Sequence, residues 1–203
     1  MIGSPLVLAT RNRGKLAEFR RLLAGHAWRV LALDEAGVDA ELDEPGPGYA
    51  DNALAKAVAA SAACGLPALG DDSGIEVEAL RGWPGPESAR WMGPDAGDAD
   101  RLAGLIAEVE RRSPEDRRVR YMAAVALARP GADPVIAHGS CTGVLVPPRG
   151  RAGFGYDPAF LSTDLGITFG EAEAAAKDAV SHRARALRRL AESGVLDPAP
   201  GSL

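Results

Sequence analysis

Acidic side chains gather at two places in the sequence, and their types could support metal chemistry. They are the adjacent pair Asp71 and Asp72, and the group Glu41, Asp43 and Glu44 in a stretch rich in Gly and Pro. Magnesium binds a few carboxylate oxygens together with waters and substrate phosphates, and a second carboxylate nearby can accept a proton from water. For the pair alone, a surface turn between two short strands is the better interpretation, because Asp favours turns.

Residues 10–15 have the composition of an anion site. A short apolar run ends there and a helical pattern begins, and the segment consists of Thr10, Arg11, Asn12, Arg13, Gly14 and Lys15. Backbone N–H groups at a helix N-terminus carry partial positive charge and bind anions readily. The spacing of a Walker A loop is absent. An ordinary strand-to-helix turn explains the segment equally well.

Lysine is scarce in this chain, since only Lys15, Lys56 and Lys177 stand among its 23 basic residues. A lysine presents a compact point charge, unlike the planar fork of arginine, so its use in an arginine-rich chain is a mild indication of a specific role. Each of the three would otherwise be interpreted as a solvated surface charge.

Two further segments could bind a nucleobase. Phe154 and Tyr156 offer stacking faces in "GFGYDPAF", Gly155 permits close backbone approach, and Asp157 is a hydrogen-bond acceptor. His182 and Arg183 in "SHR" are donors that suit a carbonyl edge of a base. Taken singly, core packing explains the aromatic residues, and a helix cap or a surface position explains the histidine.

The elements that must position these residues follow an α/β pattern. Strands are expected at 5–10, 28–33 and 75–80, and two longer ones at 117–130 and 134–148 form a hairpin through "GAD". Helices are expected at 12–25, with Gly25 as its stop, at 49–65 ending at Gly65, at 98–112 with Asp98 as N-cap, and at 181–191. The chain therefore opens as a β-α-β unit.

The 203 residues suffice for one domain or two small lobes, and 46% hydrophobic and 25% charged residues are typical of globular proteins. A net charge of −5 argues against a nucleic-acid binder, which carries a basic stripe. Cys64 and Cys141 form no metal-binding pattern, and we expect both to be small buried residues in a reducing cytosol. Neither a signal peptide nor an apolar run of membrane-spanning length is present, so we expect a soluble cytoplasmic protein without a membrane partner.

Five motifs together resemble the inosine triphosphate pyrophosphatase family over residues 6–190. They are "LVLATRNRGKLAEFRRLL", "ADNALAKA", "ALGDDSGIEVEAL" with "GWPGPESARW", "GFGYDPAF" and "KDAVSHRARAL", in this order. The resemblance implies an α/β fold with an elongated mixed sheet, flanking helices and two lobes around a central substrate cleft. It also implies a homodimer and a single domain over residues 1–196. The linker-like composition of "DPAPGSL" predicts a flexible tail at 197–203.

The same resemblance implies Mg²⁺-dependent hydrolysis of ITP, dITP and XTP to the monophosphate and pyrophosphate. Asp72 would be the general base and a magnesium ligand with Glu44, while Thr10, Asn12, Lys15 and Lys56 would hold the triphosphate. Arg11 and Arg13 depart from the family pattern and add charge beside that site, and Gly14 completes the turn. Ser73 would contact the substrate. The base platform would be Phe154, Gly155, Tyr156 and Asp157, and the pocket would be closed by Lys177, His182 and Arg183.

Two alternatives stay open. One is a pyrophosphatase that acts on modified pyrimidine or standard nucleotides with the same phosphate-binding residues. The other is a regulator that binds nucleotides without hydrolysing them, although two adjacent carboxylates would be of little use to it.

Overall fold

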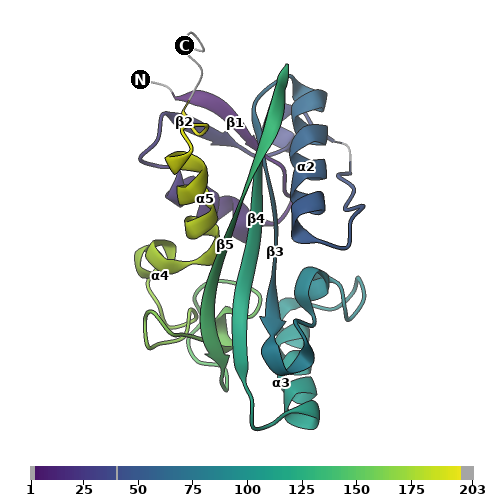
Figure 1. The fold of residues 1–203 in the computed structure, drawn as a ribbon, viewed down its shortest axis with the longest axis vertical. Coiled ribbons are helices and arrows are strands. Elements are labelled where there is room, and N and C mark those ends of the chain that lie inside the picture. Colours follow the sequence, from purple (N-terminus) through teal and green to yellow (C-terminus); the bar gives the residue numbers. More distant parts are fainter. Residues whose placement is uncertain (1–2, 40, 198–203) are drawn as a thin grey trace. The chain divides into compact units, whose positions relative to one another are not determined.

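The computed structural model describes residues 3–39 and 41–197. Within these ranges the chain forms six strands, five α-helices and several short 3₁₀ turns. The strands join in one mixed sheet with the order β2-β1-β3-β4-β5-β6 (Figure 1). The predicted α/β class with a mixed sheet is therefore confirmed. Most of the predicted tail, residues 198–203, lies outside the described residues.

The chain divides into two compact units. The first comprises the described residues up to Asp72 together with 123–139 and 183–197, and the second comprises Ser73–Met122 and Ser140–His182. Strands β3 (Ala68–Val77), β4 (Arg118–Arg129) and β5 (Ala132–Leu145) each contribute residues to both units. Each unit is described below by itself.

The first unit begins with the predicted β-α-β arrangement. It consists of β1 (Ser4–Leu8), α1 (Arg13–Leu22) and β2 (Trp28–Leu31), and β1 pairs in parallel with both β2 and β3. The side chain of Asn12 caps α1 by accepting from the backbone N–H of Lys15 at 3.0 Å. The helix ends at Leu22, before Gly25, because Leu23 caps it and its side chain turns into the core.

Helices cover both faces of the sheet in this unit. Neighbouring residues of a strand point to opposite faces, so β4 presents a different set of side chains on each face of the sheet. Ala123, Val125 and Leu127 pack with α1 and with α5 (His182–Glu192), whereas Ala124, Ala126 and Ala128 pack with α2 (Tyr49–Cys64). Figure 1 shows α2 and α5 on the two sides of this part of the sheet.

Strand β3 corrects one prediction. The turn expected at Asp71 and Asp72 does not exist, because residues 68–77 form one continuous strand. At Gly70 a β-carbon would lie 2.0 Å from the carbonyl oxygen of Ala53, so only glycine lets α2 approach the strand this closely. Acidic residues are tolerated in the buried strand because each one meets basic or amide partners on its own face.

The second unit has its own hydrophobic core. Residues of one face of α3 (Asp98–Arg112) pack with Ile75 and Val77 of β3, with Tyr121 of β4 and with residues of β5. The short strand β6 (Phe160–Ser162) pairs antiparallel with β5, and α4 (Ala174–Val180) follows it.

Three local details differ from or refine the sequence predictions. Gly97, not Asp98, caps α3, and Asp100 accepts a hydrogen bond from the Gly97 N–H at 2.9 Å. Residues 130–131 alone separate β4 from β5, so Ala132 and Asp133 of the predicted "GAD" connection already belong to β5. Both cysteines are free thiols. Cys141 is buried as predicted, whereas Cys64, the last residue of α2, is only half-buried. No helix within the described ranges is long and apolar enough to cross a membrane.

Candidate active site

Asp71 lies at the centre of a buried charge network on the α1 and α5 side of β3. Its carboxylate is 2.8 Å from Nζ of Lys15 and 3.4 Å from Nε of Arg183. Arg183 also donates through Nη1 to Glu18 at 2.9 Å, and both of these side chains are buried. Two cations and two carboxylates therefore balance one another inside the first unit.

The charges of this network determine the protonation of Asp71. Burial alone would raise the pKa of the Asp71 carboxyl, but the positive charges of Lys15 and Arg183 outweigh it and hold the pKa well below its usual range. Burial lowers the pKa of Lys15, and the carboxylate of Asp71 opposes that effect. Asp71 is thus an anchor for two basic side chains, and it stays ionised to lower pH than an ordinary carboxyl.

Asp72 points to the opposite face of β3, toward α2. Asn52 donates through Nδ2 to its Oδ2 at 3.1 Å, and Nζ of Lys56 lies 3.4 Å from its Oδ1. The same Lys56 ammonium is 2.6 Å from Oε1 of Glu44, so it lies between the two carboxylates predicted to bind magnesium. Asn52 also accepts from the N–H of Gly46, which ties the acidic loop to α2.

The environment of Asp72 differs chemically from that of Asp71. Burial raises the pKa of the Asp72 carboxyl, and the charge of Lys56 and the hydrogen bond from Asn52 offset this only in part. Two neighbouring carboxyls whose pKa values are moved apart are typical of sites in which one group is an electrostatic anchor and the other exchanges a proton.

The predicted anion segment has an ordinary local geometry. Thr10 Oγ1 accepts from the N–H of Asn12 at 3.2 Å, and the exposed Arg11 donates to the carbonyl oxygen of Asp39 at 2.7 Å. Arg13 is exposed at the first helical position, Gly14 follows it, and Ser73 lies half-buried after Asp72. The other predicted acids, Glu41 and Asp43, are exposed.

The second unit brings together a different set of predicted residues around Asp157. Its carboxylate is buried and accepts from Lys177 Nζ at 2.6 Å, from the Phe154 N–H at 2.8 Å and from the Tyr121 hydroxyl at 3.2 Å. Nζ of Lys177 also lies 5.1 Å from the centre of the Phe154 ring, a distance typical of cation–π contact.

The predicted aromatic platform divides between surface and core. Tyr156 is 5% exposed, and its hydroxyl donates to the Ser88 carbonyl and accepts from Trp91 Nε1. Phe154 is the member of the pair with more exposed surface. His182 is buried, and its ring stacks on Tyr121 with centroids 4.6 Å apart. Arg183, predicted beside it in the base pocket, forms its ion pairs in the first unit.

Two residues of the first unit contact the predicted site residues but were not themselves predicted from the sequence. Glu18 stands three residues after Lys15 and Asn52 four residues before Lys56, spacings that place side chains on the same helix face. Glu18 lies within an apolar helical pattern and Asn52 within an alanine-rich helix, so neither sequence context indicated a functional role.

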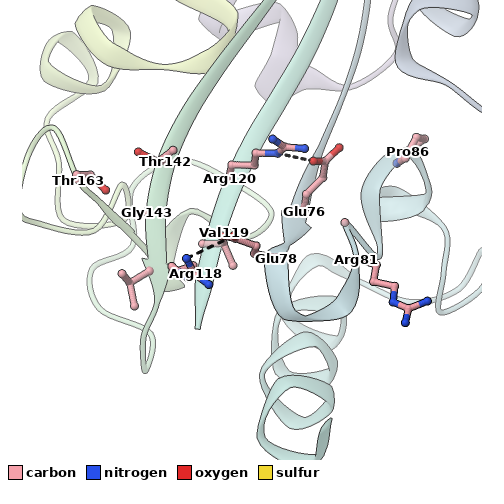
Figure 2. A pocket seen from close by; sticks show the side chains of 12 residues that line it. Glu76, Glu78, Arg81, Pro86, Arg118, Val119, Arg120, Thr142, Gly143 and Thr163 are labelled. Carbon is pink, nitrogen blue, oxygen red and sulfur yellow. Dashed lines mark hydrogen bonds and ion pairs between the residues drawn. The ribbon is translucent and has the colours of Figure 1, made fainter. Parts of the chain in front are cut away.

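A pocket of about 890 Å³ in the second unit contains none of the predicted site residues. Figure 2 shows Arg118 and Arg120 of β4 beside Glu78 and Glu76, on the strand face opposite the core, with Thr142 of β5 near them. The Arg120–Glu76 pair is 2.6 Å apart and the Arg118–Glu78 pair 3.4 Å. The two arginines of β4 are therefore already paired with acids that line the same pocket.

Comparison with known proteins gives a consistent result. The sequence profile of the Ham1 family matches residues 6–193. The dITP/XTP pyrophosphatase of Halorhodospira halophila is 49% identical over 188 residues, which are 91% of this chain and 94% of the relative. The dITP/XTP pyrophosphatase of Caulobacter vibrioides is 44% identical over 93% of this chain and 97% of its own length.

Solved structures agree with the sequence comparisons. A HAM1 protein from Coxiella burnetii superposes with a TM-score of 0.83 at 36% identity, covering 94% of this chain and 98% of that one. A nucleoside-triphosphatase / dITP/XTP pyrophosphatase from Mycobacterium abscessus gives a TM-score of 0.71 at 38% identity, over 92% of this chain and 98% of its own. These matches confirm the family resemblance predicted from the five motifs, and the chain belongs to the Ham1 family.

Proposed function

We propose that this protein hydrolyses dITP, XTP and ITP to the nucleoside monophosphate and pyrophosphate, and so removes non-standard purines from the nucleotide pool. The relatives named dITP/XTP pyrophosphatase support this substrate class. One observation in the chain carries the proposal. Asp71 and Asp72 occupy opposite faces of β3, and their surroundings move their carboxyl pKa values in opposite directions.

The basic residues of the first unit would bind the triphosphate. Lys15 and Lys56 supply full positive charges beside the two aspartates, and the first N–H groups of α1 add partial charge at Thr10 and Asn12. Arg11 and Arg13 are exposed at the same turn. Preorganised cations are most useful in this reaction because negative charge develops on the departing pyrophosphate.

Glu44 and Asp72 would hold magnesium. Both carboxylates reach the same ammonium group of Lys56, so the chain already directs two oxygen ligands and their negative charge to one point. Magnesium typically uses one or two carboxylates and takes its other ligands from water and phosphate, so the carboxylates of Glu44 and Asp72 would suffice. When bound, the ion would neutralise phosphate charge.

Asp72 would act as the general base. Its carboxylate would accept a proton from water while the water oxygen forms a bond to phosphorus, and the bond between the α and β phosphates would break to release pyrophosphate. Asn52 would hold the Asp72 carboxylate in place through its 3.1 Å hydrogen bond. Asp71 would keep Lys15 and Arg183 in position without itself exchanging a proton.

The residues around Asp157 would select the base. Hypoxanthine and xanthine present a 6-oxo acceptor where adenine presents a 6-amino donor, so a donor-lined pocket would leave adenine mispaired. Lys177 and the donor predicted at His182 support this selection, and Phe154 offers the stacking face.

The test is hydrolysis of ITP, XTP, ATP, GTP and dTTP with Mg²⁺, with pyrophosphate and phosphate measured separately. We expect rapid release of pyrophosphate from ITP and XTP, loss of activity in Asp72→Asn, and full activity in Arg120→Ala, which lies in the pocket of Figure 2. Equal turnover of ATP would refute the base selection. Binding of ITP without cleavage would favour a nucleotide-binding regulator instead.

We also propose a cytoplasmic homodimer. Two free cysteines and no disulfide among the described residues agree with a reducing compartment. Light scattering of the purified protein tests the dimer, and a mass of 21.0 kDa would refute it.

A further inference from the structure

We infer that Asp98 is a positioning residue for base recognition, because it fixes the backbone of the base loop, defined here as residues 153–157. The inference rests on the proposed function, since it gives this loop the task of holding the purine. Asp98 is the first residue of α3 and is 57 residues away from Gly155 in the sequence, so only the fold of the second unit brings them together.

The key contact is a hydrogen bond from the Gly155 N–H to Oδ2 of Asp98, 2.9 Å long. The other end of the same peptide group is held as well, because the carbonyl oxygen of Phe154 accepts from the Asp157 N–H at 3.3 Å. The plane of the peptide between Phe154 and Gly155 is thereby fixed at both ends. Gly155 has a φ of +61°, so the chain turns sharply at this point.

The carboxylate of Asp98 is itself held in place. Arg101 donates through Nη2 to its Oδ1 at 2.6 Å, and the other guanidinium nitrogen of Arg101 donates to the carbonyl oxygen of Ala96. Oδ1 is thus used by Arg101 and Oδ2 by the base loop. A negative charge at the first position of α3 also interacts favourably with the positive end of the helix dipole.

The rest of the base loop is anchored from other sides, which leaves Asp98 with a distinct task. The Tyr156 hydroxyl is bound to Ser88 and Trp91, and Asp157 is bound to Lys177. The backbone N–H of Gly155 is the point at which Asp98 supports the loop. Loss of that support would free the peptide next to Phe154, the residue that offers the stacking face.

The experiment compares Asp98→Ala with Asp98→Asn and with Asp100→Ala. Asparagine keeps an oxygen acceptor for Gly155. Asp100 is a matched control, because it is an exposed acid in the same helical turn that accepts from Gly97 and not from the base loop. Steady-state kinetics with ITP, inhibition by inorganic tripolyphosphate, which has no base, and amide exchange at Gly155 are measured for all variants.

For Asp98→Ala we expect KM for ITP to rise about three- to tenfold, the loss that one hydrogen bond typically causes, with kcat nearly unchanged. Amide exchange at Gly155 should accelerate, while the inhibition constant of tripolyphosphate should stay the same. Asp98→Asn should restore the kinetics, and Asp100→Ala should resemble wild type in KM.

Equal KM values and equal Gly155 exchange in Asp98→Ala and Asp100→Ala would overturn the inference. So would a parallel loss of tripolyphosphate binding, because that would indicate a general structural defect. If wild type releases no pyrophosphate from ITP, the proposed function fails, and with it the role in base recognition. The exchange of Gly155 would then still report separately whether Asp98 holds the loop.

Discussion

Asp71 and Asp72 are adjacent in the chain, yet their carboxylates lie on opposite faces of β3. Asp71 contacts Lys15 and Arg183 from α1 and α5, and Asp72 contacts Asn52 and Lys56 from α2. The alternation of a strand thus gives two neighbouring acids separate partners. One residue can be changed without removing the contacts of the other, which allows structural and catalytic effects to be separated by experiment.

Substitution by asparagine should affect different quantities at the two positions. Asp71→Asn leaves the buried cations of Lys15 and Arg183 without their shared carboxylate, so we expect a loss of about 3–5 kcal/mol in the free energy of unfolding. Asp72→Asn should lower kcat about 10²–10⁴-fold, as expected for removal of a general base, with little loss of stability. Urea denaturation and pyrophosphate release measure the two effects. A stable Asp71→Asn protein would contradict the anchor role.

Stability in acid should depend on Asp71. Its folded-state pKa is lowered below the value of about 3.9 that is typical of an unfolded chain. The carboxylate therefore contributes its full stabilisation above that pH and loses it progressively as the pH falls toward the folded-state pKa. In magnesium-free buffer, the difference in unfolding free energy between wild type and Asp71→Asn should narrow below about pH 4. If the difference in unfolding free energy stays constant from pH 6 to pH 3, protonation of Asp71 does not cause the loss of stability in acid.

Asn52→Ala tests the support of the proposed metal ligand. Asn52 holds Asp72 by a hydrogen bond, and loss of such a second-layer contact typically weakens metal affinity about 10–100-fold. Calorimetric titration with Mg²⁺ and the Mg²⁺ dependence of hydrolysis measure the change. Ser61→Ala is the control, because Ser61 is buried on the same helix and its hydroxyl donates to the carbonyl oxygen of Leu66. Equal Mg²⁺ affinity in the two variants would argue against Asp72 as a ligand.

The Lys177–Asp157 pair should behave as a buried salt bridge. Lys177→Met leaves the Asp157 carboxylate buried without its ammonium partner, and we expect a cost of about 3–5 kcal/mol. Adding Asp157→Asn removes the uncompensated charge and should recover part of that loss. Urea denaturation of the single and double variants gives the coupling. A double variant that is less stable by the sum of the single effects would show that the pair does not interact.

The sequence predicted the fold class and most elements, because apolar periodicity and the Gly65 stop reflect local rules. It did not predict the course of β3, since "DDSG" has the composition of a turn and the partners that stabilise it there come from distant segments. The partners of Glu18 and Asn52, which are Arg183 and Asp72, also come from distant segments, so the local pattern did not indicate a role for either residue. Tyr156 looked suitable for stacking because its residue type fits a base platform, and only the structure shows its hydroxyl bonded to Ser88 and Trp91.

The network around Asp71 has a consequence for synthesis of the chain. Arg183 is 112 residues beyond Asp71 and 165 beyond Glu18, so a ribosome has made almost the whole protein before this arginine emerges. Until then the ion pairs of Arg183 with Asp71 and Glu18 cannot form. A chain that stops short of α5 would keep buried carboxylates in excess and would unfold readily, which makes truncated products targets for proteolysis. The C-terminal helix thus completes the electrostatics of a site whose other residues were synthesised first.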